Sequence, residues 1–469
     1  MPTNDSPLQL LFLGTGTSTG LPLTPCLTQS NPYPESFSDM VPLLRASELS
    51  TSPLAHIKGS WNPDGEWPSN IPCPCCRSAV DPDVPEGWKN KRGNTSVLVR
   101  RKDKEGVYQN ILVDVGKTFR EQAGRFFPKW GVQTIDAVLL THGHADAYFG
   151  LDDLREWCIR QRRAIPVYLN QPTYEAVCTA FPYMVDKTKA SGGGDIPTLL
   201  WNIIEDHDEF EIAGVNVKSM PVHHGIYFHT VPSSNGDSEA LPVERLEPEP
   251  LICLSFMFDN SIVYISDVSS IPDKTWHRIS NRHEPASSDI KMDKYAALPT
   301  PDATPTRVVT PQTNGEKEMQ PLPILVIDAL WPLRPHTSHF SFLQALETAL
   351  RLRSSHTYLV GSTHPTTHFM WEELCLSLLD KGQGRNGKRE HPDSVQSEYL
   401  VDKVWKQVLG SKKNKDGTVK PGFGDRWKKE FESGAGIVRP AWDGLVVQIP
   451  ADEQGEVERP DQSTRGLVY

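Results

Sequence analysis

One short motif constrains this chain more than any other. Residues 141–146 read Thr-His-Gly-His-Ala-Asp, and they directly follow an apolar run at residues 135–140. An apolar run of this length is typical of a buried strand. His142, His144 and Asp146 would therefore leave the strand end together and could converge on one metal ion. The competing interpretation, a solvated loop, is disfavoured because the motif begins exactly where the predicted strand ends.

Three further segments place possible metal ligands in the same way. His223 and His224 follow a strand-like run, Asp267 follows the apolar residues 262–265, and His364 follows the predicted strand at 357–360. Hydrolysis by a divalent ion needs neutral imidazoles, one or two carboxylates and an open position for water. Because four predicted strand ends supply these groups, we expect them to share one metal site.

Composition indicates a folded core interrupted by loops. The chain has 469 residues, 38% of them hydrophobic, and 40 prolines. We predict a single domain over residues 1–450, followed by a flexible tail at 451–469. Within the domain, polar or Pro-rich segments indicate insertions near residues 30–70, 232–250, 281–320 and 382–435.

Charge and apolar patterning limit the partners. The net charge of −11 argues against a general nucleic-acid binder. No apolar stretch is long enough to cross a bilayer, and the N-terminus lacks the features of a signal peptide. We therefore expect a cytoplasmic protein, with the nucleus not excluded, that has no membrane partner. The 8 cysteines are then expected to be free thiols or metal ligands.

The alternation of strands and helices predicts an αββα sandwich, two mixed sheets with helices on their outer faces. The motif order resembles that of the metallo-β-lactamase superfamily, from an N-terminal Leu-Gly-Thr-Gly through Asp114-Val-Gly, the His motif, His224-Gly, Ser-Asp267 and Thr-His364. Residues 150–155 and 328–340 are most similar to phosphoribosyl cyclic phosphodiesterases and their uncharacterised eukaryotic relatives.

The resemblance implies a role for each ligand. His142, His144 and His224 would bind a first ion, Asp146 and His364 a second, and Asp267 would bridge both. His224 is preferred over His223 because the family ligand directly precedes a glycine.

One position departs from the family pattern, since Ala147 stands where a histidine is usual. The second ion would then be held more weakly, or by oxygen ligands that favour Mn²⁺ or Fe²⁺ over Zn²⁺. Asp152 or Asp153 could compensate, or they could cap a helix and pair with Arg155. A site with one ion also stays open.

Other residues are expected to support the chemistry. Asp114 would orient a ligand histidine through its other ring nitrogen, although a simple turn is the alternative. His339 would bind phosphate or protonate the leaving oxygen, unless it only begins a helix. His336 is a weaker candidate for the same work. Asp146 is counted with His339 among the catalytic residues.

A second metal site is indicated by cysteines in a Pro-rich loop. The resemblance implies a structural Zn²⁺ held by cysteines and a late histidine. Cys26, Cys73 and Cys76 would supply the thiolates and His368 the fourth ligand. Cys73 and Cys76 are favoured for their C-x-x-C spacing, and whether Cys75 replaces Cys76 stays open. Free thiols are the alternative interpretation.

These observations predict a metal-dependent hydrolase using one or two ions, Zn²⁺ or Mn²⁺. The resemblance favours a phosphodiesterase that acts on a small cyclic phosphate or nucleotide-like diester through a metal-bound hydroxide. Alternatives are a lactone or thioester hydrolase, a nuclease processing tRNA 3′ ends, and a non-catalytic metal-binding protein. Nucleic acid is an unlikely partner because the lysines at 403–420 are interpreted as a solvated linker, and a homodimer is possible.

Overall fold

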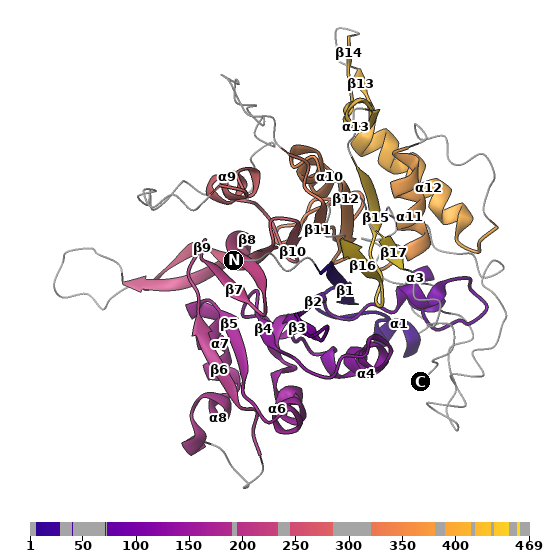
Figure 1. Cartoon of the computed structure of the whole chain (residues 1–469). Coiled ribbons are helices and arrows are strands. Elements are labelled where there is room, and N and C mark those ends of the chain that lie inside the picture. The colour runs from indigo at the N-terminus through magenta and orange to yellow at the C-terminus, as the bar shows by residue number, and fades with distance from the viewer. Residues whose placement is uncertain are drawn as a thin grey trace.

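The computed structural model describes most of the chain and shows two β-sheets packed face to face (Figure 1). The described residues are 6–28, 40, 71, 73–189, 195–232, 244–284, 320–379, 390–413, 418–432, 436–449 and 457–459. Helices cover the outer faces of both sheets, so the predicted αββα sandwich is confirmed. Within the described residues, no helix combines the length and the apolar character needed to cross a membrane.

The first sheet has eight strands in the order β17-β16-β1-β2-β3-β4-β5-β6. Their bounds are β1 Leu8–Gly14, β2 Ser96–Lys102, β3 Tyr108–Val113, β4 Ala137–Leu139, β5 Ile165–Leu169, β6 Leu199–Ile203, β16 Val446–Ile449 and β17 Val457–Arg459. In β1, Leu10 and Phe12 face the other sheet, whereas Leu11 and Leu13 face the helices. Both sides of the strand are buried, which explains its nearly continuous apolar sequence.

The second sheet has seven strands in the order β15-β12-β11-β10-β9-β8-β7. Their bounds are β7 Glu209–Ile212, β8 Val215–Pro232, β9 Glu244–Phe258, β10 Ile262–Ile265, β11 Ile324–Asp328, β12 His356–Val360 and β15 Ile437–Pro440. Strands β10, β11 and β12 are parallel neighbours. Their carboxyl ends therefore lie at one edge of the sheet, where the segments that carry the predicted ligands begin.

The helices divide between the two outer faces. Residues of α4, α6 and α7 pack on the first sheet, and residues of α9 to α13 pack on the second. The longer helices are α4 Phe119–Trp130, α6 Arg155–Gln161, α7 Gln171–Ala180, α9 Asp273–Ser280, α10 Phe342–Arg351, α11 His368–Ser377, α12 Ser394–Val404 and α13 Phe423–Glu432. Short elements are α1 Thr24–Thr28, α3 Pro74–Ser78, α5 Ala145–Tyr148, α8 Pro182–Val185, η2 Gly87–Asn90, η3 Leu151–Leu154, η4 Lys187–Lys189, η5 Trp405–Leu409, and the β13 Lys412–Lys413 and β14 Val419–Lys420 pair.

Three expected loop segments contain regular structure. The basic segment within 382–435 forms α12, η5 and α13, whose Leu400, Val404 and Trp427 are buried in the core. Its interpretation as a solvated linker is therefore wrong for the part that the structure describes. Residues 244–250 belong to β9, and the predicted tail contributes β17, which pairs with β16. Most of the insertions predicted at 30–70 and 281–320 lie outside the described residues.

Candidate metal centre

Three histidines, two that follow a strand of the first sheet and one within a strand of the second, meet in the fold. His142 and His144 follow β4, and His224 lies on β8. The ring centroids of His142 and His144 are 4.6 Å apart, and each is 5.1 Å from that of His224. One ring nitrogen from each histidine lies within 4.8 Å of the other two. The sequence prediction that these three residues converge agrees with this placement.

Hydrogen bonds fix which nitrogen of His142 faces the centre. The Thr141 hydroxyl donates to Asp114 Oδ2 at 2.8 Å and lies 2.8 Å from His142 Nδ1, so that Nδ1 must donate to the hydroxyl. His142 Nε2 is buried and has no hydrogen-bond partner. An orphaned buried nitrogen is costly unless it binds something, and its lone pair points to where the other histidines meet. Asp114 therefore orients His142 through Thr141 rather than directly.

A β-bulge directs His224 into the centre. His223 pairs with Ile252 and Ile226 pairs with Pro250, so His224 and Gly225 together stand opposite Leu251. Gly225 has a φ of 74°, a left-handed conformation that favours glycine. His224 Nδ1 donates to the Ser338 carbonyl at 2.8 Å, which leaves Nε2 for a ligand. His223 instead contacts the Ser270 hydroxyl at 3.0 Å, which supports the choice of His224.

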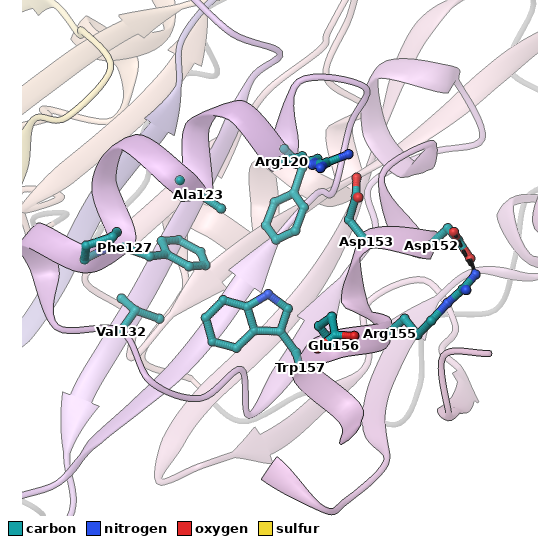
Figure 2. A pocket seen from close by; sticks show the side chains of 12 residues that line it. Arg120, Ala123, Phe127, Val132, Asp152, Asp153, Arg155, Glu156 and Trp157 are labelled. Atoms are coloured by element: carbon teal, nitrogen blue, oxygen red, sulfur yellow. Dashed lines mark hydrogen bonds and ion pairs between the residues drawn. The ribbon is translucent and has the colours of Figure 1, made fainter. Parts of the chain in front are cut away.

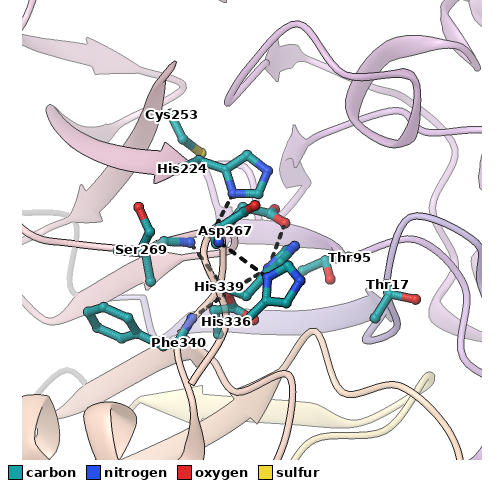
Figure 3. Close-up of polar contacts among 12 residues, drawn as sticks. Thr17, Thr95, His224, Cys253, Asp267, Ser269, His336, His339 and Phe340 are labelled. Carbon is teal, nitrogen blue, oxygen red and sulfur yellow. Dashed lines mark hydrogen bonds and ion pairs between the residues drawn. The ribbon is translucent and has the colours of Figure 1, made fainter. Parts of the chain in front are cut away.

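Asp267 and His339 complete the cluster (Figure 3). Asp267 follows β10, and its Oδ1 lies 3.6 Å from His339 Nδ1. His339 Nδ1 donates to Asp328 Oδ2 at 2.8 Å, and Asp328 ends β11 and is fully buried. The ring centroids of His224 and His339 are 4.8 Å apart, and His336 lies 5.4 Å beyond His339. His339 thus lies beside the histidine triad.

Burial and neighbouring charges set the protonation of the cluster. Burial lowers the pKa of His142 to about 3, so its imidazole is neutral near pH 7 and can act as a ligand. Burial would raise the pKa of Asp267, but the adjacent His224, His142 and His339 lower it to about 2. Burial also opposes the charge on His339, but Asp328 outweighs it and raises that pKa to about 9.

The donor set fits a divalent ion. Three imidazoles with available nitrogens and one ionised carboxylate match the ligand types of zinc and related ions in hydrolases. The second group of ligand atoms within 4.8 Å of one another is His224, Asp267 and His339. Both groups include His224, so they describe one contiguous centre.

Asp146 and the acidic residues beyond it do not belong to these groups. Among the described residues, Asp146 belongs to no set of three ligand atoms within 4.8 Å. Burial and Asp267 raise its pKa to about 6, against the charge of Lys117. Asp152 forms two bonds to Arg155, of 2.8 and 3.0 Å, so the helix-start ion pair is the interpretation that fits. Asp153 lines a surface cavity of about 610 Å³ between α4 and α6, outside the centre (Figure 2).

His364 is the main correction to the predicted ligand set. Its Nδ1 lies 3.3 Å from Cys73 Sγ, 3.7 Å from Cys26 Sγ and 3.9 Å from Cys76 Sγ. The prediction that it joins the histidine centre is wrong for this placement. Arg92 explains the position, because its guanidinium donates to the carbonyls of Ser362 and Thr366 and so fixes the loop beside the cysteines.

The cysteine cluster therefore uses a different histidine from the one predicted. Its four residues are Cys26, Cys73, Cys76 and His364. Cys73 caps α3, so Cys73 and Cys76 share a face of its first turn. Cys75 points elsewhere, with its sulfur 3.7 Å from Asn90 Oδ1, which resolves the choice in favour of Cys76.

His368, predicted as the fourth ligand, begins α11 and lies outside the cluster. Its backbone N–H donates to Asn90 Oδ1, and its ring packs 5.5 Å from that of Trp442.

The electrostatics of this second cluster suit a soft cation. Hydrogen bonds from Cys73 and Cys76 lower the pKa of the Cys26 thiol, whereas burial raises that of Cys73. These hydrogen bonds favour the thiolate form of Cys26. Three sulfurs and one imidazole nitrogen form the donor set of a closed tetrahedral zinc site.

Comparison with known proteins agrees with this geometry. Residues 109–289 match the family model described as the β-lactamase superfamily domain. Within residues 109–289, the chain belongs to the β-lactamase superfamily. The matched range includes His142, His144, His224 and Asp267, whereas His339 and the cysteine cluster lie outside it.

Individual relatives of this superfamily domain are distant or partial. An octanoyltransferase of Porphyromonas gingivalis is 32% identical over 153 residues, which cover 33% of this chain and 27% of that protein. The chain thus spans about a quarter of that relative. A diphosphatase of the PhnP family is 21% identical with a TM-score of 0.44, covering 77% of this chain and 89% of the other. The metallo-β-lactamase fold protein YhfI of Bacillus subtilis is 11% identical with a TM-score of 0.43, and the match covers 94% of this chain and 99% of that protein.

Two residues near the histidine centre were not singled out from the sequence. Asp328 lies at the end of a buried strand, which is the same signal that identified Asp267. Lys117 follows Asp114-Val-Gly, and only its proximity to Asp146 in the fold distinguishes it from other lysines. The first could have been found from the sequence, and the second could not.

Proposed function

We propose that this chain is a metal-dependent phosphodiesterase that acts on a small cyclic phosphate or nucleotide-like diester. The observation that carries the proposal is that a set of metal-binding side chains lies next to a histidine that can donate a proton. Three imidazoles and Asp267 could hold an ion, and His339, hydrogen-bonded to a buried carboxylate, lies next to them.

The ligand residues prepare the centre for a divalent ion. His142, His144 and His224 would hold it, with Asp267 as the carboxylate. When bound, such an ion polarises a phosphoryl oxygen and lowers the pKa of a coordinated water towards ~7. The Thr141 hydroxyl and the Ser338 carbonyl keep the Nε2 atoms of His142 and His224 pointed inward. These hydrogen bonds fix ring orientation, as is usual for metal-binding histidines.

His339 is placed to donate a proton to the leaving oxygen. Asp328 holds its Nδ1, so Nε2 is the atom that can reach a substrate. Because Asp328 raises the pKa of His339 to about 9, the ring carries a proton near neutral pH. A general acid of this kind typically contributes 10²–10⁴-fold to the rate. The positive ring would also stabilise charge that develops on an anionic phosphoryl group.

The cysteine cluster has a separate, structural role in this proposal. Cys26 on α1, Cys73 and Cys76 at α3, and His364 after β12 would bind one Zn²⁺. The site would join three loops that are far apart in the sequence. A closed set of four protein ligands leaves no position for substrate, so this ion would stabilise the fold rather than react.

A substrate panel with elemental analysis tests the proposal. Purified protein is assayed with bis(p-nitrophenyl) phosphate, cyclic nucleotides, ribose cyclic phosphate and a lactone, before and after chelation. We expect chelator-sensitive cleavage of the diesters. Turnover of the lactone alone would replace the phosphodiesterase by an ester hydrolase, and absence of turnover with bound metal would support a non-catalytic protein.

Adjacent histidines provide a matched pair of variants. H224A should abolish diester cleavage because it removes a ligand, whereas H223A should retain it because His223 contacts Ser270 instead. Equal loss in both variants would contradict the assignment of His224.

A further inference from the structure

The number of histidine nitrogens with a free lone pair limits how many ions the histidine centre can bind. The two ligand groups, His142 with His144 and His224, and His224 with Asp267 and His339, share His224. His224 Nδ1 donates to the Ser338 carbonyl, so only Nε2 has a lone pair available. One such nitrogen binds one ion. The two groups therefore cannot each hold an ion at the same time.

A second position lacks the imidazoles that it would need. Ala147 supplies only a methyl group, buried at 2% exposure, where the superfamily pattern has a histidine. His364, the other expected imidazole, lies against the three cysteine sulfurs. Apart from His339, which the proposed function uses as a proton donor, the groups that remain are Asp146 and Asp267, and the first ion already uses Asp267. Two carboxylates alone are a weak site for zinc compared with the histidine triad.

A lysine directly follows a close backbone contact with Asp146. Val115 and Gly116 pack along the metal-binding loop, with Val115 N–H donating to the Ala147 carbonyl at 2.7 Å. Gly116 approaches so closely that a Cβ there would lie 1.8 Å from the Asp146 carbonyl oxygen. Lys117 comes directly after this contact, and its charge acts on Asp146. Its side chain is exposed, so a substrate can reach it.

We infer that the histidine centre takes one ion and that the Lys117 ammonium provides the second positive charge, binding a phosphoryl oxygen of the anionic diester on the Asp146 side. The ion count stands independently, whereas the role of Lys117 rests on the proposed phosphodiesterase function. A lysine suits this role because its ammonium is a compact charge with three donors on a flexible stem.

Ion counting tests the first half. The full-length protein is saturated with Zn²⁺ and measured by native mass spectrometry. We expect two ions per chain, one in each cluster, and one in H142A. D146N should still hold two ions. Three ions in the parent protein, or loss of one in D146N, would overturn the inference, as would the spectrum of a coupled Mn²⁺ pair in the Mn²⁺-loaded protein.

Charge variants test the second half. K117Q should lower kcat/KM for bis(p-nitrophenyl) phosphate about tenfold, the effect of one charge-assisted hydrogen bond, and leave a neutral p-nitrophenyl ester unaffected. K117R should recover most of the loss. K104Q, which removes an exposed lysine from the β2–β3 turn, is the matched control and should change neither substrate.

The outcomes separate the two ideas. No effect of K117Q, or an equal effect on both substrates with an unchanged ion count, would refute the role of Lys117. If the parent protein cleaved only the neutral ester, the phosphodiesterase proposal would fail while the ion count could still hold.

Discussion

Replacing Gly225 by alanine would probe how the bulge in β8 sets metal affinity. Gly225 has a φ of 74°, and a Cβ added there would lie 3.1 Å from both Cβ and Oγ of Ser338. The carbonyl of that same serine holds His224 Nδ1 at 2.8 Å. The methyl group of G225A therefore pushes on the residue that orients a ligand.

G225A should have two separate costs, one in folding stability and one in metal affinity. A left-handed backbone costs an L-residue roughly 1–2 kcal/mol, which lowers the stability of the metal-free protein. Displacing the Ser338 carbonyl disturbs a partner of a ligand histidine, a change that typically weakens metal binding by about 10–100-fold. That range corresponds to about 1.4–2.8 kcal/mol of binding free energy. The second cost appears only in metal affinity.

Gly214 gives a control with the same backbone and no contact. Its φ is 77°, and no heavy atom lies within 4 Å of an added Cβ. G214A should lose stability as G225A does but bind metal normally. The assay is competition between the histidine centre and a chelator for Co²⁺. Co²⁺ at the centre is monitored by its absorption bands, which differ from those of thiolate-bound Co²⁺. Equal affinity in the two variants would refute the proposed link between the bulge and His224.

Three further variants test other parts of the structure. H364A should lose one zinc per chain and lower the melting temperature, while H368A keeps the ion, as measured by elemental analysis; loss of zinc in H368A alone would restore the original ligand prediction. D328N should reduce kcat for diesters about 100-fold and shift the alkaline limb of the pH–rate profile below pH 9, because the carboxylate that raises the pKa of His339 is gone; an unchanged profile would exclude His339 as the acid. Burial raises the pKa of Asp443 from 3.8 to about 6, so the folded state favours its protonated form, and the stability that this preference gives is full below pH 3.8 and lost as pH rises through 6. Relative to D443N, the parent protein should lose about 3 kcal/mol of stability across that window, and parallel pH curves in thermal unfolding would contradict this.

The ligands of the histidine centre were predictable because short sequence patterns around them determine their positions. Buried strands are marked by apolar runs, and polar residues at their ends meet wherever the strands are neighbours in a sheet. This reasoning applies to His142, His144 and Asp267, all of which follow such runs. The preference for His224 came from the glycine after it, and the bulge gives that glycine a physical purpose.

The destination of His364 could not be predicted in this way. It follows β12 with the same signal as the other ligands, but two metal clusters compete for it. Arg92, 270 residues before Ser362, decides between them by fixing the loop with hydrogen bonds. A contact of such long sequence separation leaves no trace in the local pattern. The helices α12 and α13 were missed because the polar and charged residues within and around them hide the few apolar residues that they bury.

The position of β16 has a consequence for biosynthesis. β16 pairs with β1, and Asp443 just before it accepts hydrogen bonds from Thr15 and Gly93. This edge of β1 therefore stays unpaired until a strand far later in the chain has been synthesised. Until then an apolar strand edge is open to other chains, the situation in which nascent proteins aggregate and chaperones act. A premature stop codon before residue 443 should therefore yield insoluble protein even though it spares every ligand of both metal clusters.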